Sequence, residues 1–185
     1  MTRTALPEVP VIDPDVHRDQ RGFFLETYHR DRYVEHGIAM VFVRDNHSKS
    51  GGRTIRGLHL QVQHPQAKLI RVIDGEIFDV AVDVRRGSPT FGRWVSSTLS
   101  ADNFRVCYVP ERFAHGFAVT SRSAEVEYKC SDIYFPEGEV GITWNDPRLA
   151  ISWPFDQPVL SVRDGRHPTL AEREDQLPVY RPPNP

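Results

Sequence analysis

Short runs in which apolar and polar residues alternate follow one another along most of the chain. In EIFDVAVDVR (76–85), every second side chain from Phe78 onward is Phe or Val, which is the period-2 pattern of a β-strand. Comparable runs are MVFVRDN (40–46), TIRGLHLQ (54–61), AKLIRVID (67–74), TFGRWVSSTLS (90–100), FRVCYVP (104–110), HGFAVTS (115–121), AEVEYKCSDIY (124–134) and GITW (141–144). Strands this short, with turn residues about every 8–12 positions, predict an all-β antiparallel sandwich or barrel.

The segments outside this region have other patterns. The first 25 residues contain the extended stretches VPVID (9–13) and RGFFLE (21–26), and a short helix is expected from Arg30 to His36, ended by Gly37 as a left-handed cap. The tail after Trp153 is predicted to be rich in loops, with its last prolines frayed. We expect one domain over residues 1–185, with a barrel core over about 40–155.

The strand-like run 76–85 raises two further expectations. Asp74-Gly75 precedes it, and Asp-Gly favours type I′ turns, so 67–74 and 76–85 are predicted to form a β-hairpin. Asp79 and Asp83 share a face with Ile77 and Ala81. Either that face is solvated, or the two carboxylates stand in the wall of a polar, ligand-binding cavity inside the barrel.

The composition excludes several classes of protein. Of 185 residues, 39% are hydrophobic and 26% are charged, as in an ordinary soluble protein. The net charge of -2 argues against broad nucleic-acid binding, and no apolar run approaches the ~18 residues of a membrane span. The N-terminal segment lacks the apolar core of a signal peptide. We expect a cytoplasmic protein with no nucleic-acid or membrane partner, in which Cys107 and Cys130 are reduced, buried thiols.

The stretch RTIRGLHLQ (53–61) places a histidine inside an apolar strand. Strand side chains alternate, so Arg56 and His59 should point to opposite faces unless a bulge at Gly57 re-aims one of them. His59 could be a packed core histidine, a metal ligand or a catalytic base. The pattern alone leaves these three open.

Further ionisable residues fall in similar apolar strands. They are Arg56, His59, Lys68, Asp79, His115 and Tyr128. Each has an ordinary interpretation: a satisfied core histidine, an edge-strand lysine or a half-buried tyrosine. Together they are harder to explain as core filling, because buried charges are costly unless they are paired.

Metal and nucleophile chemistry fit this chain poorly. Metal-binding cupin barrels offer His-x-His with a nearby Glu and a distant His, whereas here Gln61 follows His59 and no carboxylate comes soon after. PERFAH (110–115) does resemble the second cupin motif, with Arg112 in place of glycine. Two histidines alone make a poor ligand set, and no nucleophile elbow, dinucleotide motif or P-loop is present. Acid–base chemistry on an activated C–H bond remains.

The ordered motifs of the chain closely resemble the dTDP-4-dehydrorhamnose 3,5-epimerase family of the cupin superfamily. They run from DQRGFFLE (19–26) through DNHSKS, RGLHLQ, FDVAVDVR, SPTFG, VPERFAHGF, EVEYKC and WNDP to LSVRD (160–164). The resemblance implies an all-β cupin-type jelly-roll barrel and a homodimer with a swapped N-terminal segment. It also implies an isomerase that needs neither metal nor cofactor. The expected reaction converts dTDP-4-dehydro-6-deoxy-D-glucose into dTDP-4-dehydro-L-rhamnose through an enolate.

The resemblance also implies roles for individual residues. The catalytic set is His59 as base, Asp164 as its dyad partner, Tyr128 as acid and Lys68 as stabiliser of the developing charge near the ketone. The expected substrate-binding residues are Arg21 and Arg56 at the diphosphate, Glu26 and Asn46 at the base or sugar, Tyr134 stacked on thymine, and Arg44, His115 and Glu139 as further contacts. Arg21 is expected to come from the dimer partner.

Four positions depart from the family pattern. Arg44 stands in place of a glutamine and His17 in place of a phenylalanine, both near the expected nucleotide site. Leu60 and Arg112 replace an aromatic residue and a glycine. Alternatives to double epimerisation are a 3-only or 5-only epimerase for an antibiotic sugar, a catalytically silent sugar-nucleotide-binding barrel, and a metal-dependent cupin oxygenase.

Overall fold

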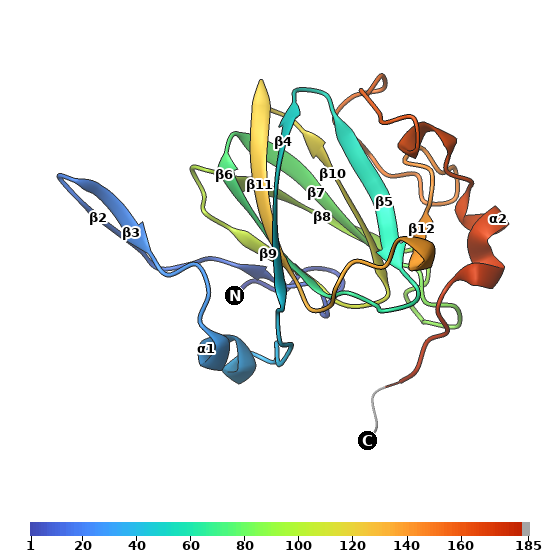
Figure 1. Cartoon of the computed structure of the whole chain (residues 1–185), viewed down its shortest axis with the longest axis horizontal. Coiled ribbons are helices and arrows are strands. Elements are labelled where there is room, and N and C mark those ends of the chain that lie inside the picture. The colour runs from blue at the N-terminus through green and yellow to red at the C-terminus, as the bar shows by residue number, and fades with distance from the viewer. Residues whose placement is uncertain (183–185) are drawn as a thin grey trace.

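Two antiparallel five-stranded sheets form the body of the protein in a computed structural model, which describes residues 1–182 (Figure 1). The strands are β1 (Val11–Ile12), β4 (Arg44–Gly51), β5 (Ile55–Gln61), β6 (Lys68–Asp74), β7 (Glu76–Asp83), β8 (Trp94–Ser100), β9 (Val106–Val109), β10 (Phe113–Val119), β11 (Ser123–Cys130) and β12 (Glu139–Gly141). The first sheet has the order β1-β9-β6-β11-β4, and the second has the order β12-β5-β10-β7-β8.

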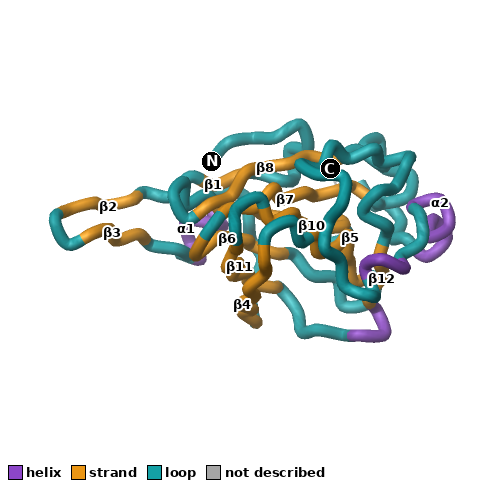
Figure 2. The backbone as a smooth tube through the Cα atoms, turned by 90° about the horizontal axis from the view of Figure 1, so that it is seen from above, coloured by secondary structure: helices purple, strands orange, loops and turns teal. Residues whose placement is uncertain are grey.

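Apart from the short helix η1 (Pro136–Gly138), which precedes β12, the remaining elements lie at the two ends of the chain. β2 (Val16–Asp19) and β3 (Gly22–Leu25) form a hairpin that projects from the barrel (Figures 1 and 2). The predicted helix is confirmed as α1 (Arg30–Glu35), and Gly37 follows it with φ 86°. The tail is loop-rich, as predicted, and its described part, residues 154–182, has only the short helices η2 (Asp164–Arg166), α2 (Leu170–Arg173) and η3 (Glu174–Gln176). Pro183 and Pro185, part of the predicted frayed end, lie outside the described residues.

The alternation of side chains on β7 produces two apolar layers. Ile77 and Ala81 belong to the core between the sheets, together with residues of β6, β8, β9, β10 and β11. Val80 and Val82 face the other way and pack with β5, β12 and the C-terminal segments. The second sheet is therefore covered on both faces, which explains why its central strands β7 and β10 are buried along almost their whole length.

The structure corrects three details of the predicted strands. β6 and β7 do not form a hairpin: Gly75, with φ 77°, carries the chain from the first sheet to the second, where β7 pairs with β8 and β10. The first central strand begins only at Arg44, so 40–43 are outside it. The last predicted strand, 141–144, is β12 instead and ends at Gly141.

A β-bulge interrupts β5 at the position where the sequence allowed one. His115 of β10 lies opposite His59, but Phe117 lies opposite Arg56, so β5 carries one extra residue. Gly57 has φ 113°, and a Cβ there would lie 2.7 Å from the backbone of Gly116. Only glycine fits this close approach of two strands.

The two aspartates of β7 are buried, which decides between the two interpretations of their face. Asp79 and Asp83 are 1% and 0% exposed, so the solvated interpretation of their face is wrong. Asp83 accepts hydrogen bonds from Arg85, Ser88 and Thr90.

Cys107 and Cys130 are buried and form no disulfide, as predicted. Among residues 1–182, no helix has the length and apolar character needed to cross a membrane.

Candidate active site

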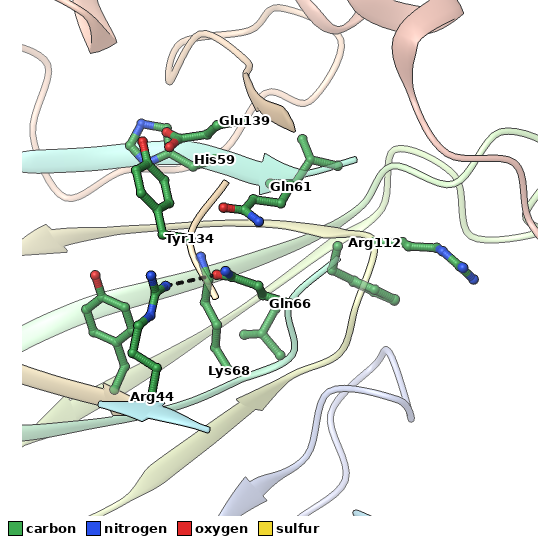
Figure 3. A pocket seen from close by; sticks show the side chains of 12 residues that line it. Arg44, His59, Gln61, Gln66, Lys68, Arg112, Tyr134 and Glu139 are labelled. Carbon is green, nitrogen blue, oxygen red and sulfur yellow. Dashed lines mark hydrogen bonds between the residues drawn. The ribbon is translucent and has the colours of Figure 1, made fainter. Parts of the chain in front are cut away.

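A cleft between the two sheets contains half of the predicted site residues (Figure 3). Of the predicted residues, its lining includes His59, Lys68, Tyr128, Arg44, Tyr134 and Glu139. The cleft is therefore a polar cavity with aromatic side chains and several cations, which favours an anionic ligand.

His59 and Asp164 form a hydrogen-bonded pair at one wall of the cleft. Nε2 of His59 lies 2.6 Å from Oδ1 of Asp164, whose side chain is 6% exposed. Asp164 begins η2, and its backbone N–H donates to the hydroxyl of Ser161, which fixes the loop. Burial opposes ionisation of Asp164, but the hydrogen bond and charge of His59, the hydrogen bond of Ser161 and the charge of His167 together outweigh it, so the pKa of Asp164 lies below its ordinary value. The predicted dyad is present in the structure.

Tyr128 and Lys68 stand on the opposite sheet. Tyr128 lies on β11 and Lys68 on the neighbouring β6, where Lys68 pairs in register with Cys130. Burial raises the pKa of Tyr128, so the phenol keeps its proton at neutral pH. Burial lowers the pKa of Lys68, and the nearby charge of Arg44 adds to that shift. A histidine on one wall thus faces a phenol and an amine on the other.

The polar residues around the cleft mouth form a second group. The Arg44 guanidinium donates to Oε1 of Gln66 at 3.3 Å and lies 5.7 Å from the centre of the Tyr134 ring (Figure 3). Glu139 forms an ion pair with Arg163 at 3.0 Å. Tyr134 is 45% exposed, so its ring can receive a planar partner.

Five of the predicted binding residues do not line the cleft. Arg21 lies at the tip of the β2–β3 hairpin and is paired with Asp19, while Glu26 follows this hairpin and is paired with Arg32. Asn46 is on β4, where its amide contacts Cys130. Arg56 is exposed and donates to Ser50, and its positive charge opposes the rise that burial causes in the pKa of Tyr128. The fifth is His115.

His115 was expected either to contact the substrate or to support residues that do. It is buried, with Nε2 2.7 Å from Oδ2 of Asp79. Asp79 is thereby explained as the partner of a buried histidine, and neither residue reaches the cleft surface. The register places His115 opposite His59 of β5 and Ala81 of β7, so its side chain lies on the same face of the sheet as His59, where Asp79 holds its Nε2.

Several residues at the site were missed in the sequence. Gln61 and Gln66 line the cleft, and Gln61 could have been found because it lies two residues beyond His59 on the same strand face. His167 follows η2, and its Nε2 lies 3.3 Å from Oδ1 of Asp164. No strand pattern marks that loop position. His59, Asp164 and His167 are the cluster of potential metal ligands found within residues 1–182.

The other three residues that depart from the family pattern lie in three different parts of the structure. Arg112 lines the cleft with φ 67°, a conformation that favours glycine, which explains the glycine of the family motif. Leu60 is 4% exposed and belongs to the apolar layer on the outer face of the second sheet. His17 lies on β2 of the projecting hairpin.

Comparisons with known proteins decide the family. The sequence profile described as dTDP-4-dehydrorhamnose 3,5-epimerase matches residues 3–172. The chain belongs to this family. A dTDP-4-dehydrorhamnose 3,5-epimerase of Neisseria gonorrhoeae is 51% identical over 92% of the chain, which spans about half (52%) of that relative's length. The family and the isomerase class predicted from the sequence are confirmed by these matches.

Two further relatives bear on the fold and on the reaction. The solved structure of dTDP-6-deoxy-D-glucose-3,5-epimerase from Legionella pneumophila, in complex with dTDP-4-keto-L-rhamnose, has a TM-score of 0.95 and 46% identity. That match covers 98% of both chains and confirms the predicted jelly-roll fold. A dTDP-4-dehydrorhamnose 3-epimerase of Streptomyces niveus is 40% identical over 91% of this chain and 84% of its own length.

Proposed function

We propose that the chain converts dTDP-4-dehydro-6-deoxy-D-glucose into dTDP-4-dehydro-L-rhamnose by epimerisation at C3 and C5, without a cofactor. The observation that carries the proposal is the placement of the His59–Asp164 pair and Tyr128 on opposite walls of one cleft. Inversion at carbon needs a proton removed from one face and a proton returned to the other. Two proton-transfer groups on facing sheets meet this requirement.

The C4 ketone of the sugar supplies the chemical logic. It acidifies the hydrogens on C3 and C5, because loss of either leaves an enolate. Nε2 of His59 is held by Asp164, so Nδ1 is the ring nitrogen that takes the proton from carbon. The developing charge on the C4 oxygen is stabilised by the Lys68 ammonium. Tyr128 then gives its phenolic proton to the opposite face of the carbon and recovers it from solvent.

The nucleotide half of the substrate would occupy the cleft mouth. Tyr134 offers an exposed ring for thymine, and Arg44, 5.7 Å from that ring, offers a charge for the diphosphate. Arg56, Asn46 and Glu139 are proposed as further contacts on the sugar and phosphate side. His115 is proposed to act from behind the cleft, by holding Asp79 beside Lys68.

A homodimer completes this proposal. Phe23 and Phe24 of the projecting hairpin are 56% and 71% exposed, and apolar groups of this size favour burial against a partner. The hairpin points away from its own barrel (Figure 1). A swapped arrangement would carry Arg21 and Glu26 into the cleft of the second subunit. A cytoplasmic location and a single domain over residues 1–185 stay predictions.

Deuterium labelling tests the reaction directly. The purified chain is incubated with dTDP-4-dehydro-6-deoxy-D-glucose in deuterated water, and the product is examined by NMR. Double epimerisation predicts label at C3 and C5 with both centres inverted. Label and inversion at one centre alone would favour the single-epimerase alternative, which the Streptomyces niveus relative supports. An unlabelled sugar would indicate a silent binding barrel and contradict the proposal.

A further inference from the structure

His167 has a buried side chain that the proposed epimerase reaction does not use. This side chain is 7% exposed, and its buried Nε2 makes no well-aligned hydrogen bond. That nitrogen lies 3.3 Å from Oδ1 of Asp164, in the catalytic dyad. A buried polar atom without a well-aligned partner is costly and calls for an explanation.

The backbone of β12 fixes the position of this ring. Gly141 pairs in register with His59, and a Cβ on Gly141 would overlap the His167 ring. The two imidazoles are therefore placed by the same pair of strands, with ring centres 5.4 Å apart and ring planes at 85°. The pairing of β5 with β12 and the η2 turn therefore hold both imidazoles close to Asp164.

The geometry points to a zinc site. We propose that His59, Asp164 and His167 bind one Zn²⁺ ion, which switches the epimerase off. The ligand atoms, one from each residue, all lie within 4.8 Å of one another. Two imidazoles and a carboxylate form a ligand set that zinc accepts, with a fourth position left for water.

The distances fit this ion. Tetrahedral ligands at about 2.0–2.1 Å from zinc lie about 3.3 Å from each other. His167 and Asp164 already have this separation, at 3.3 Å. His59 and Asp164, now 2.6 Å apart across a hydrogen bond, must open to admit the ion in place of the bridging proton. His59 is 29% exposed toward the cleft, so the ion has a way in.

Inhibition follows from the chemistry of imidazole. A neutral imidazole carries one ring proton. When Nε2 of His59 binds zinc, that proton is held on Nδ1, and Nδ1 has no lone pair left to accept a proton from carbon. The ion also ties Asp164 to a fixed charge. Zinc therefore blocks the step in which His59 acts as the base.

Zinc content and zinc inhibition test the site separately. The parent chain is stripped with EDTA, dialysed against zinc chloride and assayed for bound metal, and turnover is then measured over a range of zinc concentrations. We expect one zinc per chain, loss of turnover and recovery on adding EDTA. In His167→Asn, half-inhibition should need at least about tenfold more zinc, since outer-shell changes alone alter metal affinity by ~10–100-fold.

His64→Asn is the matched control. His64 pairs with Asp132 at 3.3 Å, is 51% exposed and has φ 52°, which asparagine tolerates. This variant should match the parent in zinc content and inhibition, and it also controls for zinc bound by the substrate diphosphate. Magnesium, which prefers oxygen ligands, should not inhibit.

Two outcomes would overturn the zinc site: a parent chain that retains no zinc, or a His167→Asn variant as sensitive as the parent. Should His167→Asn not fold, His59→Asn is assayed for zinc content alone and should also lose the ion. The inhibitory role rests on the proposed epimerase function, whereas zinc content does not. A chain that binds zinc through His167 but epimerises nothing would support the site and refute the function.

Discussion

Oδ1 of Asp164 lies 2.6 Å from Nε2 of His59, although the two residues are 105 positions apart in the sequence. The carboxylate is 6% exposed and the loop that carries it is tied to Ser161. This contact holds the imidazole in one tautomer and turns Nδ1 toward the cleft. The proposed chemistry depends on it, because an unoriented histidine is a poor general base.

Replacing His59 by alanine should remove the base. We expect His59→Ala to lower turnover by roughly two to four orders of magnitude, which is the usual contribution of a positioned general base. Affinity for dTDP should change far less, since Arg44 and Tyr134 lie at the cleft mouth. Steady-state kinetics and calorimetric titration with dTDP check the two parts. Parental turnover in the variant would remove His59 from the mechanism.

The pH dependence should reveal Lys68. Burial lowers the pKa of this lysine, and its stabilising cation is present below that pKa and lost above it. Turnover should therefore fall on the alkaline side, starting below the ordinary lysine range. In Lys68→Arg the guanidinium stays charged, so any remaining activity should lose this limb. Profiles of kcat/KM against pH compare the two, and an unshifted limb would assign the titration to another group.

Gly57 should be irreplaceable in β5. An alanine Cβ would lie 2.7 Å from backbone atoms of His115 and Gly116, at φ 113°. We expect Gly57→Ala to lower the free energy of unfolding by roughly 2–5 kcal/mol through overpacking and backbone strain. Gly51→Ala is the control, because nothing lies within 4 Å and its φ is ordinary. Denaturant titration should show little change there; equal loss in both variants would contradict the close-packed bulge.

Subunit mixing should show whether Arg21 serves the partner's cleft. Arg21→Ala and His59→Ala are each expected to be poorly active alone. If Arg21 crosses over, a mixed dimer has one cleft with both defects and one with neither. Co-refolded equimolar chains should then regain about a quarter of the parental activity, because half of the randomly formed dimers contain one intact cleft. No recovery in mixtures that sedimentation shows to be dimers would place Arg21 in its own subunit's cleft.

Much of the fold can be predicted from local sequence patterns, and the errors in that prediction have a physical cause. Alternation identifies β7 to β11, because one face of each strand must meet the core. The failed hairpin at Asp74-Gly75 shows the limit: local turn chemistry reports a reversal of the chain, but not which sheet the next strand joins.

The site is less accessible to sequence patterns. Strand alternation interrupted by a bulge accounts for the positions of Arg56 and His59 on β5. The same two-residue period places Gln61 on the face of His59. Asp164 and His167 belong to an irregular loop, so no period ties them to β5. Their meeting with His59 depends on the packing of the C-terminal segment over the second sheet. Family resemblance suggested Asp164, whereas His167 was found only in three dimensions.

The central claim is that acid and base are separate groups on facing walls, and Tyr128→Phe tests it most directly. The change keeps the ring and removes only the phenolic proton, while His59 and Lys68 can still form the enolate. NMR in deuterated water should then show label at C3 or C5 with retained configuration, and little inverted sugar. If the variant instead inverts both centres at the parental rate, Tyr128 is not the acid and the two-wall mechanism is wrong.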